Sequence, residues 1–200
     1  RPASTWRYPD RIPGFPRRAR WHRIANRPDA ASPPMAVTTE IDLPDPAATD
    51  RAGAALGLAL KPGDAVMLEG RLGAGKSALV RAAIKALLAE NGRSEEVPSP
   101  TYTLAQIYET ARGPVWHADL YRLGSPEEAR ELGLSEALGG AICFVEWPSR
   151  LGPQRPDGAL TARLSFGFET DARRLELSAR DAARWAAVVD AVHGAAGAAR

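Results

Sequence analysis

The order of apolar and polar positions after Met35 predicts alternating strands and helices. Alternation or a short apolar run is typical of a strand, whereas apolar positions that recur every three or four residues are typical of a helix. The elements expected first are a strand over 38–43, a helix over 47–60, a strand over 65–69 and a helix over 77–90. The second of these helices should stop at Asn91-Gly92, because glycine favours a helix end.

The same pattern continues to the end of the chain. The expected elements are strands over 102–109, 115–119 and 141–146, a helix over 125–138, a hairpin of 162–168 with 173–179, and a helix over 181–193. Ser125 should be the N-cap of its helix, with Pro126 at the first position and a glutamate completing a capping box. This order predicts a three-layer α/β domain with a mainly parallel central sheet and an antiparallel hairpin near the C-terminus.

A glycine-rich loop joins the expected strand over 65–69 to the helix that follows. Residues 70–77 read GRLGAGKS and fit the pattern G-x-x-x-x-G-K-[S/T]. The glycines allow backbone N–H groups to point inward as a nest for an anion, and the helix start adds its positive dipole end. Lys76 should reach the β- and γ-phosphates, and Ser77 should offer its hydroxyl to Mg²⁺. The loop therefore predicts a nucleoside triphosphate bound with Mg²⁺, in a domain of the P-loop NTPase type.

Two acids end apolar strands near this loop. Asp119 ends the strand over 115–119, and Glu146 ends the strand over 141–146. In doubly wound folds, ligands bind at the carboxyl ends of the strands, so either acid could hold Mg²⁺ or polarise a water. The alternative is that each acid simply marks where solvent begins. Ser99-Pro100-Thr101 could likewise sense the γ-phosphate or be an ordinary turn.

Three further residues can be explained by structural roles alone. His117 is expected to be a structural strand residue, because the sequence shows no partner for it. Trp147, followed by Pro148, could be a stacking platform or a packing residue. Cys143 lies in an apolar run and should be an inert core thiol.

Composition divides the chain at its N-terminus. Residues 1–34 carry eight Arg against two Asp and seven of the 17 prolines, so their net charge is +6 and the rest of the 200 residues carry −4 of the total +2. Such a segment buries too little apolar surface to fold. We expect residues 1–34 to be an extension outside the packed fold or upstream of the true start, 35–194 to be the ATPase domain and 195–200 a flexible tail. A basic arm for RNA is the alternative role for the extension.

Other sequence features limit the class of protein. No apolar run approaches the roughly 18 residues of a membrane-spanning helix, and we expect no membrane or DNA partner. The single cysteine favours a reducing compartment, which predicts a cytoplasmic protein. There is no Asn-Lys-x-Asp motif for guanine, so ATP is expected rather than GTP.

Four motifs together resemble one family. GRLGAGKS at 70–77, SPTYTL at 99–104, HADLYRL at 117–123 and EWP at 146–148 match the TsaE family, also called YjeE, in order and spacing. The resemblance covers about residues 35–179. It implies a weak Mg²⁺-dependent ATPase that acts with the TsaD and TsaB proteins, and through them with tRNA, in threonylcarbamoyl modification of adenosine 37.

The resemblance also assigns roles to residues. It implies catalytic roles for Lys76, Asp119 and Glu146, and Mg²⁺ ligation by Ser77 and Glu146. The implied nucleotide contacts are Thr49, Leu72, Gly73, Ala74, Gly75, Lys76, Ser77, Ala78 and Thr101. Two loop residues depart from the family pattern: Ser77 replaces threonine and keeps the hydroxyl, while Arg71 replaces an aspartate, with an effect that the sequence does not decide.

Two other functions use the same features. A small-molecule or nucleoside kinase would use the same loop, and a short segment between Arg150 and Arg155 could imitate a kinase lid. A non-catalytic nucleotide sensor or RNA-binding protein would rely on the basic extension. The SPT, DLYRL and EWP motifs are not general features of P-loop proteins.

Overall fold

The computed structural model describes residues 36–198, so the expected extension, residues 1–34, lies outside the described range. The strands are β1 (Val37–Leu43), β2 (Ala65–Glu69), β3 (Ala105–Thr110), β4 (Gly113–Asp119), β5 (Ile142–Glu146), β6 (Leu160–Phe166) and β7 (Arg173–Ala179). The helices are α1 (Pro46–Ala59), α2 (Lys76–Ala89), α3 (Pro126–Glu131), α4 (Leu134–Ala137) and α5 (Ala182–Gly197), with a 3₁₀ helix, η1, over Pro148–Gln154.

The strands form one sheet in the order β1-β7-β6-β2-β5-β4-β3. Its four central strands, β6, β2, β5 and β4, run parallel, whereas β7 pairs antiparallel with both β6 and β1, and β3 pairs antiparallel with β4. The expected parallel centre and C-terminal hairpin are therefore confirmed. The carboxyl ends of the parallel strands meet at one edge, where ligands bind in such sheets.

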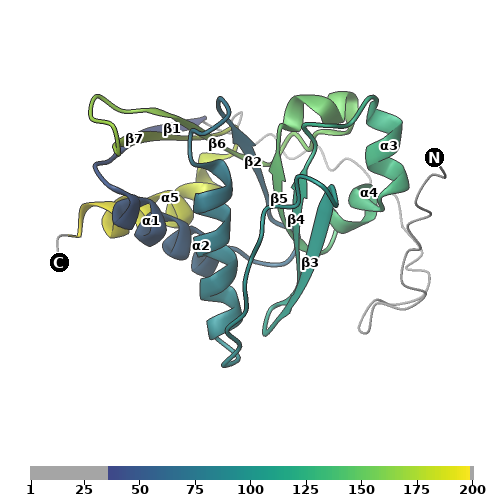
Figure 1. Ribbon diagram of the computed structural model, residues 1–200, viewed down its shortest axis with the longest axis horizontal. Helices are drawn as coiled ribbons and strands as arrows, with labels where there is room; N and C mark the ends of the chain where they lie inside the picture. Colours follow the sequence, from purple (N-terminus) through teal and green to yellow (C-terminus); the bar gives the residue numbers. More distant parts are fainter. Residues whose placement is uncertain (1–35, 199–200) are drawn as a thin grey trace. The chain divides into compact units, whose positions relative to one another are not determined.

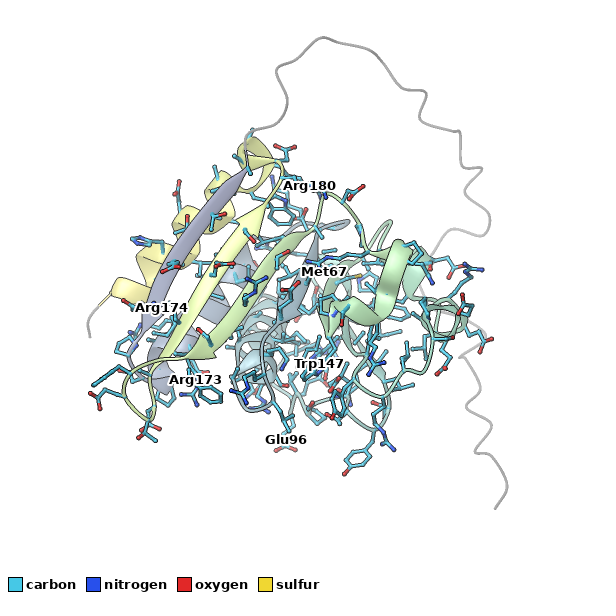
Figure 2. The ribbon with its side chains drawn as sticks, turned by 90° about the horizontal axis from the view of Figure 1, so that it is seen from above. Met67, Glu96, Trp147, Arg173, Arg174 and Arg180 are labelled. Atoms are coloured by element: carbon cyan, nitrogen blue, oxygen red, sulfur yellow. The ribbon has the colours of Figure 1, made fainter. Side chains whose placement is uncertain are left out.

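Helices cover the two faces of the sheet unequally. On one face α1, α2 and α5 pack together over a large apolar core that includes Leu68, Phe144 and Leu175 (Figure 1). On the other face α3, α4 and η1 cover β2, β5 and β4 through a smaller core around Met67 and Val145. The opposite face of β6, β7 and β1 is left open (Figure 2), which explains the alternation of buried and more exposed positions along β7. The three-layer α/β prediction is confirmed, with a third layer that covers part of the sheet.

Helices α1 and α2 pack unusually closely because α1 has glycines at the contact. A Cβ on Gly53 would overlap the Leu79 carbonyl oxygen, and a Cβ on Gly57 would lie 2.5 Å from the Ala83 carbonyl oxygen. The matched increments of four residues show that the two helices run in the same sense where they cross.

The helix expected over 125–138 is wrong in its length. Gly133 adopts a left-handed backbone, with φ of 77°, and divides the segment into α3 and α4. Ser125 is the N-cap and Pro126 follows at the first position, as expected, but no side-chain capping hydrogen bond forms. The strand expected over 102–109 also begins late, because Leu104 has φ of 65° and its N–H bonds back to the Pro100 carbonyl. Residues 101–104 consequently form a turn.

The C-terminal helix is longer than expected. Helix α5 continues to Gly197, so residues 195–197, expected in a flexible tail, are helical and Ala196 is buried. Between residues 36 and 198, no helix combines the length and apolar character needed to cross a membrane.

Candidate nucleotide-binding site

The glycine-rich loop leaves the end of β2 and enters α2. All three of its glycines have positive φ, and a Cβ on Gly70 would overlap the carbonyl oxygen of Leu164 on β6. Gly75 is the N-cap of α2 with φ of 103°, and Lys76 is the first helical residue. A side chain at Gly70 or Gly75 would strain this backbone, which explains the need for glycine. The start of α2 thus faces the edge of the sheet as an anion-binding end.

Lys76 is held inside the loop. Its ammonium donates to the carbonyl oxygens of Gly70 at 3.0 Å and Arg71 at 3.1 Å, and it lies 4.3 Å from the ring centre of Trp147. Burial lowers the pKa of Lys76, and the nearby carboxylates of Glu146 and Asp119 partly oppose that shift. The side chain is only 4% exposed. Lys76 is therefore a pre-placed cation next to two acids, at the loop that can bind phosphate.

The two acids lie side by side, as their strand positions predicted. Asp119 and Glu146 are opposite residues in the parallel pairing of β4 with β5, and both are buried. Asp119 is fixed through both oxygens: Oδ2 accepts from the Thr101 hydroxyl at 2.9 Å and Oδ1 from the Tyr121 N–H at 3.0 Å. Ser99 and Thr101 hydroxyls are also 2.9 Å apart. The segment around Thr101 is thereby tied to the acid at the end of β4.

Glu146 has a different partner. Its Oε1 lies 2.9 Å from Nε2 of His117, a residue on β4 that is 1% exposed. The Nδ1 atom of His117 is the one buried side-chain polar atom without a hydrogen-bond partner within residues 36–198. His117 was expected to lack a partner, and the structure corrects that expectation.

These groups surround one cavity of about 240 Å³. Its lining residues are Leu72, Gly73, Gly75, Lys76, Ser77, Ala78, Thr101, Asp119, Tyr121, Glu146 and Trp147. Nine of them were expected site residues, and Tyr121 and Trp147 are additions. The Trp147 ring lies 4.9 Å from that of Tyr121, and Trp147 has φ of 58° immediately after β5. Their motifs, DLYRL and EWP, were visible in the sequence, but only the fold brings the two rings together.

Two expected nucleotide contacts do not line this cavity. Ala74 is buried in the main core, and its N–H is used inside the loop by the Arg71 carbonyl. Thr49 is buried in α1. Gly53, one turn after Thr49 on α1, contacts Leu79 of α2.

The β6–β7 hairpin covers the other side of the loop. A Cβ on Gly73 would lie 3.8 Å from the Phe166 ring, and one on Gly75 would lie 4.0 Å from Cγ of Arg173. The Arg173 guanidinium lies 5.0 Å from the ring of Phe166, and it donates to the carbonyl oxygens of Thr170 and Ala172. Figure 2 shows Arg173 at the same edge of the sheet as Trp147. Sequence reasoning missed Phe166 and Arg173, because nothing local links this hairpin to residues 70–77.

Arg71 lies outside the cavity of Lys76. It helps to line a neighbouring hollow of about 550 Å³ with Glu69, Gly70, Leu72, Trp147, Pro148 and Ser149. Glu69 is itself paired with Arg155 and Arg163 at 2.8 and 2.9 Å. Those two arginines lower the pKa of Glu69 against the opposing effect of its burial, which is the largest single influence. The exposed Arg71 side chain therefore faces a different environment from the acids beside Lys76.

The donor atoms of the cavity fit Mg²⁺. The Ser77 hydroxyl and the carboxylates of Glu146 and Asp119 are hard oxygen ligands, which Mg²⁺ prefers. No group of three or more His, Cys, Asp or Glu side chains in the described part of the chain forms a metal site by itself. Mg²⁺ is usually held by one or two carboxylates together with substrate phosphates.

Known proteins match the chain over this region. The family model "Threonylcarbamoyl adenosine biosynthesis protein TsaE" matches residues 43–175. Curated proteins named "tRNA threonylcarbamoyladenosine biosynthesis protein TsaE" are similar. The one from Rickettsia felis is 48% identical over 92 residues, 46% of this chain and 52% of that protein. The one from Nostoc sp. is 37% identical over 137 residues, 66% of this chain and 80% of that protein.

The chain spans about half the length of the Rickettsia relatives it matches. Among solved structures, the crystal structure of YdiB from Bacillus subtilis has a TM-score of 0.63 and 26% identity, with 79% of this chain and 95% of that one covered.

Proposed function

The chain belongs to the TsaE family, and from that premise we propose that it binds and hydrolyses ATP with Mg²⁺ in the threonylcarbamoyl modification of adenosine 37 in tRNA. The observation that carries the proposal is one cavity lined by Lys76, Ser77, Asp119, Glu146 and Thr101. It joins a phosphate-binding loop to two acids and a hydroxyl-bearing segment, which are the groups that phosphoryl transfer to water needs.

The loop binds the phosphates. Backbone N–H groups at the start of α2 donate hydrogen bonds to phosphate oxygens, and Lys76 exchanges its two carbonyl partners for phosphate oxygens. Because Lys76 is already buried and close to its final position, little side-chain freedom remains to be lost on binding. The same cation offsets charge that develops on the transferred phosphoryl group.

Ser77 and Glu146 would hold Mg²⁺. When bound, the ion would supply positive charge that polarises the terminal phosphates. Glu146 suits this role better than Asp119, because only one oxygen of Glu146 is engaged, by His117, whereas each oxygen of Asp119 accepts a hydrogen bond. Asp119 instead fixes the segment around Thr101 beside the cavity, and a remaining lone pair of its carboxylate can orient the water that attacks.

The nucleoside part would extend away from the acids, toward the β6–β7 hairpin. Arg173 and Phe166 lie against the loop glycines there and offer a cation and an aromatic face. Thr49, which is buried in α1, would supply the adenine-side contact implied by the family. We propose Arg173 as a further nucleotide contact.

The mouth of the cavity suits a protein partner. Leu72 is 77% exposed, Tyr121 50% and Phe166 51%, although large apolar side chains normally avoid solvent. We propose that TsaD and TsaB proteins act with this chain, that tRNA is reached through them, and that docking near the mouth stimulates slow hydrolysis. A reducing compartment such as the cytoplasm fits the proposal, given one buried thiol, Cys143.

Phosphate release from ATP and Mg²⁺, measured with and without a TsaD–TsaB pair, tests the proposal. We expect slow release that rises with the pair and falls at least 100-fold in Lys76→Ala and Glu146→Ala. A hydrolysis rate for Glu146→Ala equal to the unmodified chain at saturating Mg²⁺ would refute the role of Glu146. Transfer of phosphate to a nucleoside or sugar instead of water would favour the kinase alternative.

A further inference from the structure

A buried histidine lies directly beneath the proposed Mg²⁺ ligand. His117 pairs with Phe144 across β4 and β5, while Asp119 pairs with Glu146 two residues further along. Residues two apart in a strand point to the same face, so His117 is the diagonal neighbour of Glu146 on the face that carries the cavity. This explains why its Nε2 reaches Oε1 of Glu146 at 2.9 Å.

The direction of this hydrogen bond follows from the role of Glu146. A carboxylate that holds a cation is ionised and can only accept, so Nε2 of His117 carries the proton and donates it to Oε1. The other ring nitrogen, Nδ1, is left without a partner. Oε2 of Glu146 has no hydrogen-bond partner within the described residues. Unlike Nδ1 of His117, it is not a fully buried atom, so it remains open to the cavity.

The unpaired Nδ1 shows that His117 does not occupy this position for packing alone. An orphaned buried polar atom costs about 1–3 kcal/mol, whereas an apolar side chain of the same size would avoid that cost. The neighbours of His117 on β4 and β5, Val115 and Phe144, are apolar and fully buried, so the site accepts such a side chain. The compensating benefit has to come from what Nε2 does to Glu146.

We propose that His117 is a positioning residue for Mg²⁺ binding. It fixes the Glu146 carboxylate by holding Oε1, and so presents Oε2 to the metal-nucleotide. Partners that orient a ligand from behind raise metal affinity by about 10- to 100-fold in other sites. The inference rests on the proposed function, because it needs a nucleotide bound with Mg²⁺ at this cavity.

Two substitutions of His117 by side chains of similar length separate a role in positioning Glu146 from a role in packing alone. His117→Gln keeps an N–H donor near the place of Nε2, whereas His117→Met has the same length without a donor. The affinity for a fluorescent ADP analogue is measured in EDTA and across a Mg²⁺ titration. We expect His117→Gln to stay within about threefold of the unmodified chain, and His117→Met to require about tenfold more Mg²⁺ while its affinity in EDTA is unchanged.

Several outcomes would overturn the inference. A Mg²⁺ requirement for His117→Met within twofold of the unmodified chain would show that the hydrogen bond is irrelevant. Equal loss of ADP affinity in EDTA for both variants would show a structural role only. The same comparison in a Glu146→Gln background separates lost positioning from poor folding. Since the carboxylate that His117 positions is absent there, His117→Met must add no further Mg²⁺ requirement. Failure of the unmodified chain to bind ADP would instead contradict the proposed function.

Discussion

The close packing of α1 on α2 predicts that a glycine-to-alanine substitution in α1 destabilises the domain, which is the opposite of its usual effect in a helix. Replacing a helical glycine with alanine normally stabilises a helix by about 1 kcal/mol. At Gly57, however, the added Cβ would lie 2.5 Å from the Ala83 carbonyl oxygen and 2.9 Å from its carbonyl carbon. Both atoms belong to the backbone of α2, so they cannot move aside as the end of a side chain would. The whole helix has to shift by about half an ångström or more.

Such overpacking costs about 1–3 kcal/mol, and backbone contacts favour the upper end. After the gain in helix propensity, Gly57→Ala should lower the free energy of unfolding by about 2 kcal/mol. For a domain of this size, that loss corresponds to a melting temperature about 4–8 °C lower. Because α2 carries Lys76 and Ser77 at its start, the affinity for ADP with Mg²⁺ should also fall.

Gly194→Ala is the matched control. Gly194 lies in α5, is exposed, and has nothing within 4 Å of an added Cβ. This variant should gain up to about 1 kcal/mol, with ADP affinity unchanged. Urea unfolding and thermal melts of the two variants measure the difference. A melting temperature for Gly57→Ala equal to or above that of Gly194→Ala would refute the reasoning about helix contact.

Two further predictions concern single side chains. Arg173→Met keeps the aliphatic stem beside Gly75 but removes the guanidinium, so ADP affinity measured by fluorescence titration should fall about tenfold. Arg174→Met, which alters an exposed pair with Asp42, should leave that affinity unchanged, and equal affinities for the two variants would contradict a role of Arg173. Burial raises the pKa of the Cys143 thiol to about 12, so a disulfide reagent at pH 8 should react only after unfolding. Full labelling of the folded chain within minutes would show that Cys143 is not sealed in the core.

Local sequence was enough to predict most elements of the sheet. The periods of apolar residues indicated the seven strands, and Gly70, Gly73 and Gly75 indicated the loop. The prediction from local sequence failed at Gly133 and Leu104, where one residue with a left-handed backbone ends or interrupts an element. Hydrophobic period does not report such a residue, because a helix broken by one turn keeps almost the same apolar spacing.

The site was predictable only in part. Asp119 and Glu146 could be placed together from the sequence, because the carboxyl ends of parallel strands share an edge. Thr101 could be suspected from its motif, but its hydrogen bond to Asp119 depends on the turn over residues 101–104.

By itself, then, the sequence determined the loop that can bind phosphate, the acids at the strand ends and the family motifs. The tertiary structure decided which partners those groups have: His117 behind Glu146, Trp147 over Lys76, and Arg173 beside Gly75. The reason is physical. Loop chemistry and helix or strand period act over a few neighbouring residues, whereas these contacts join residues from different strands, loops and helices, and depend on strand order and register that no local pattern encodes.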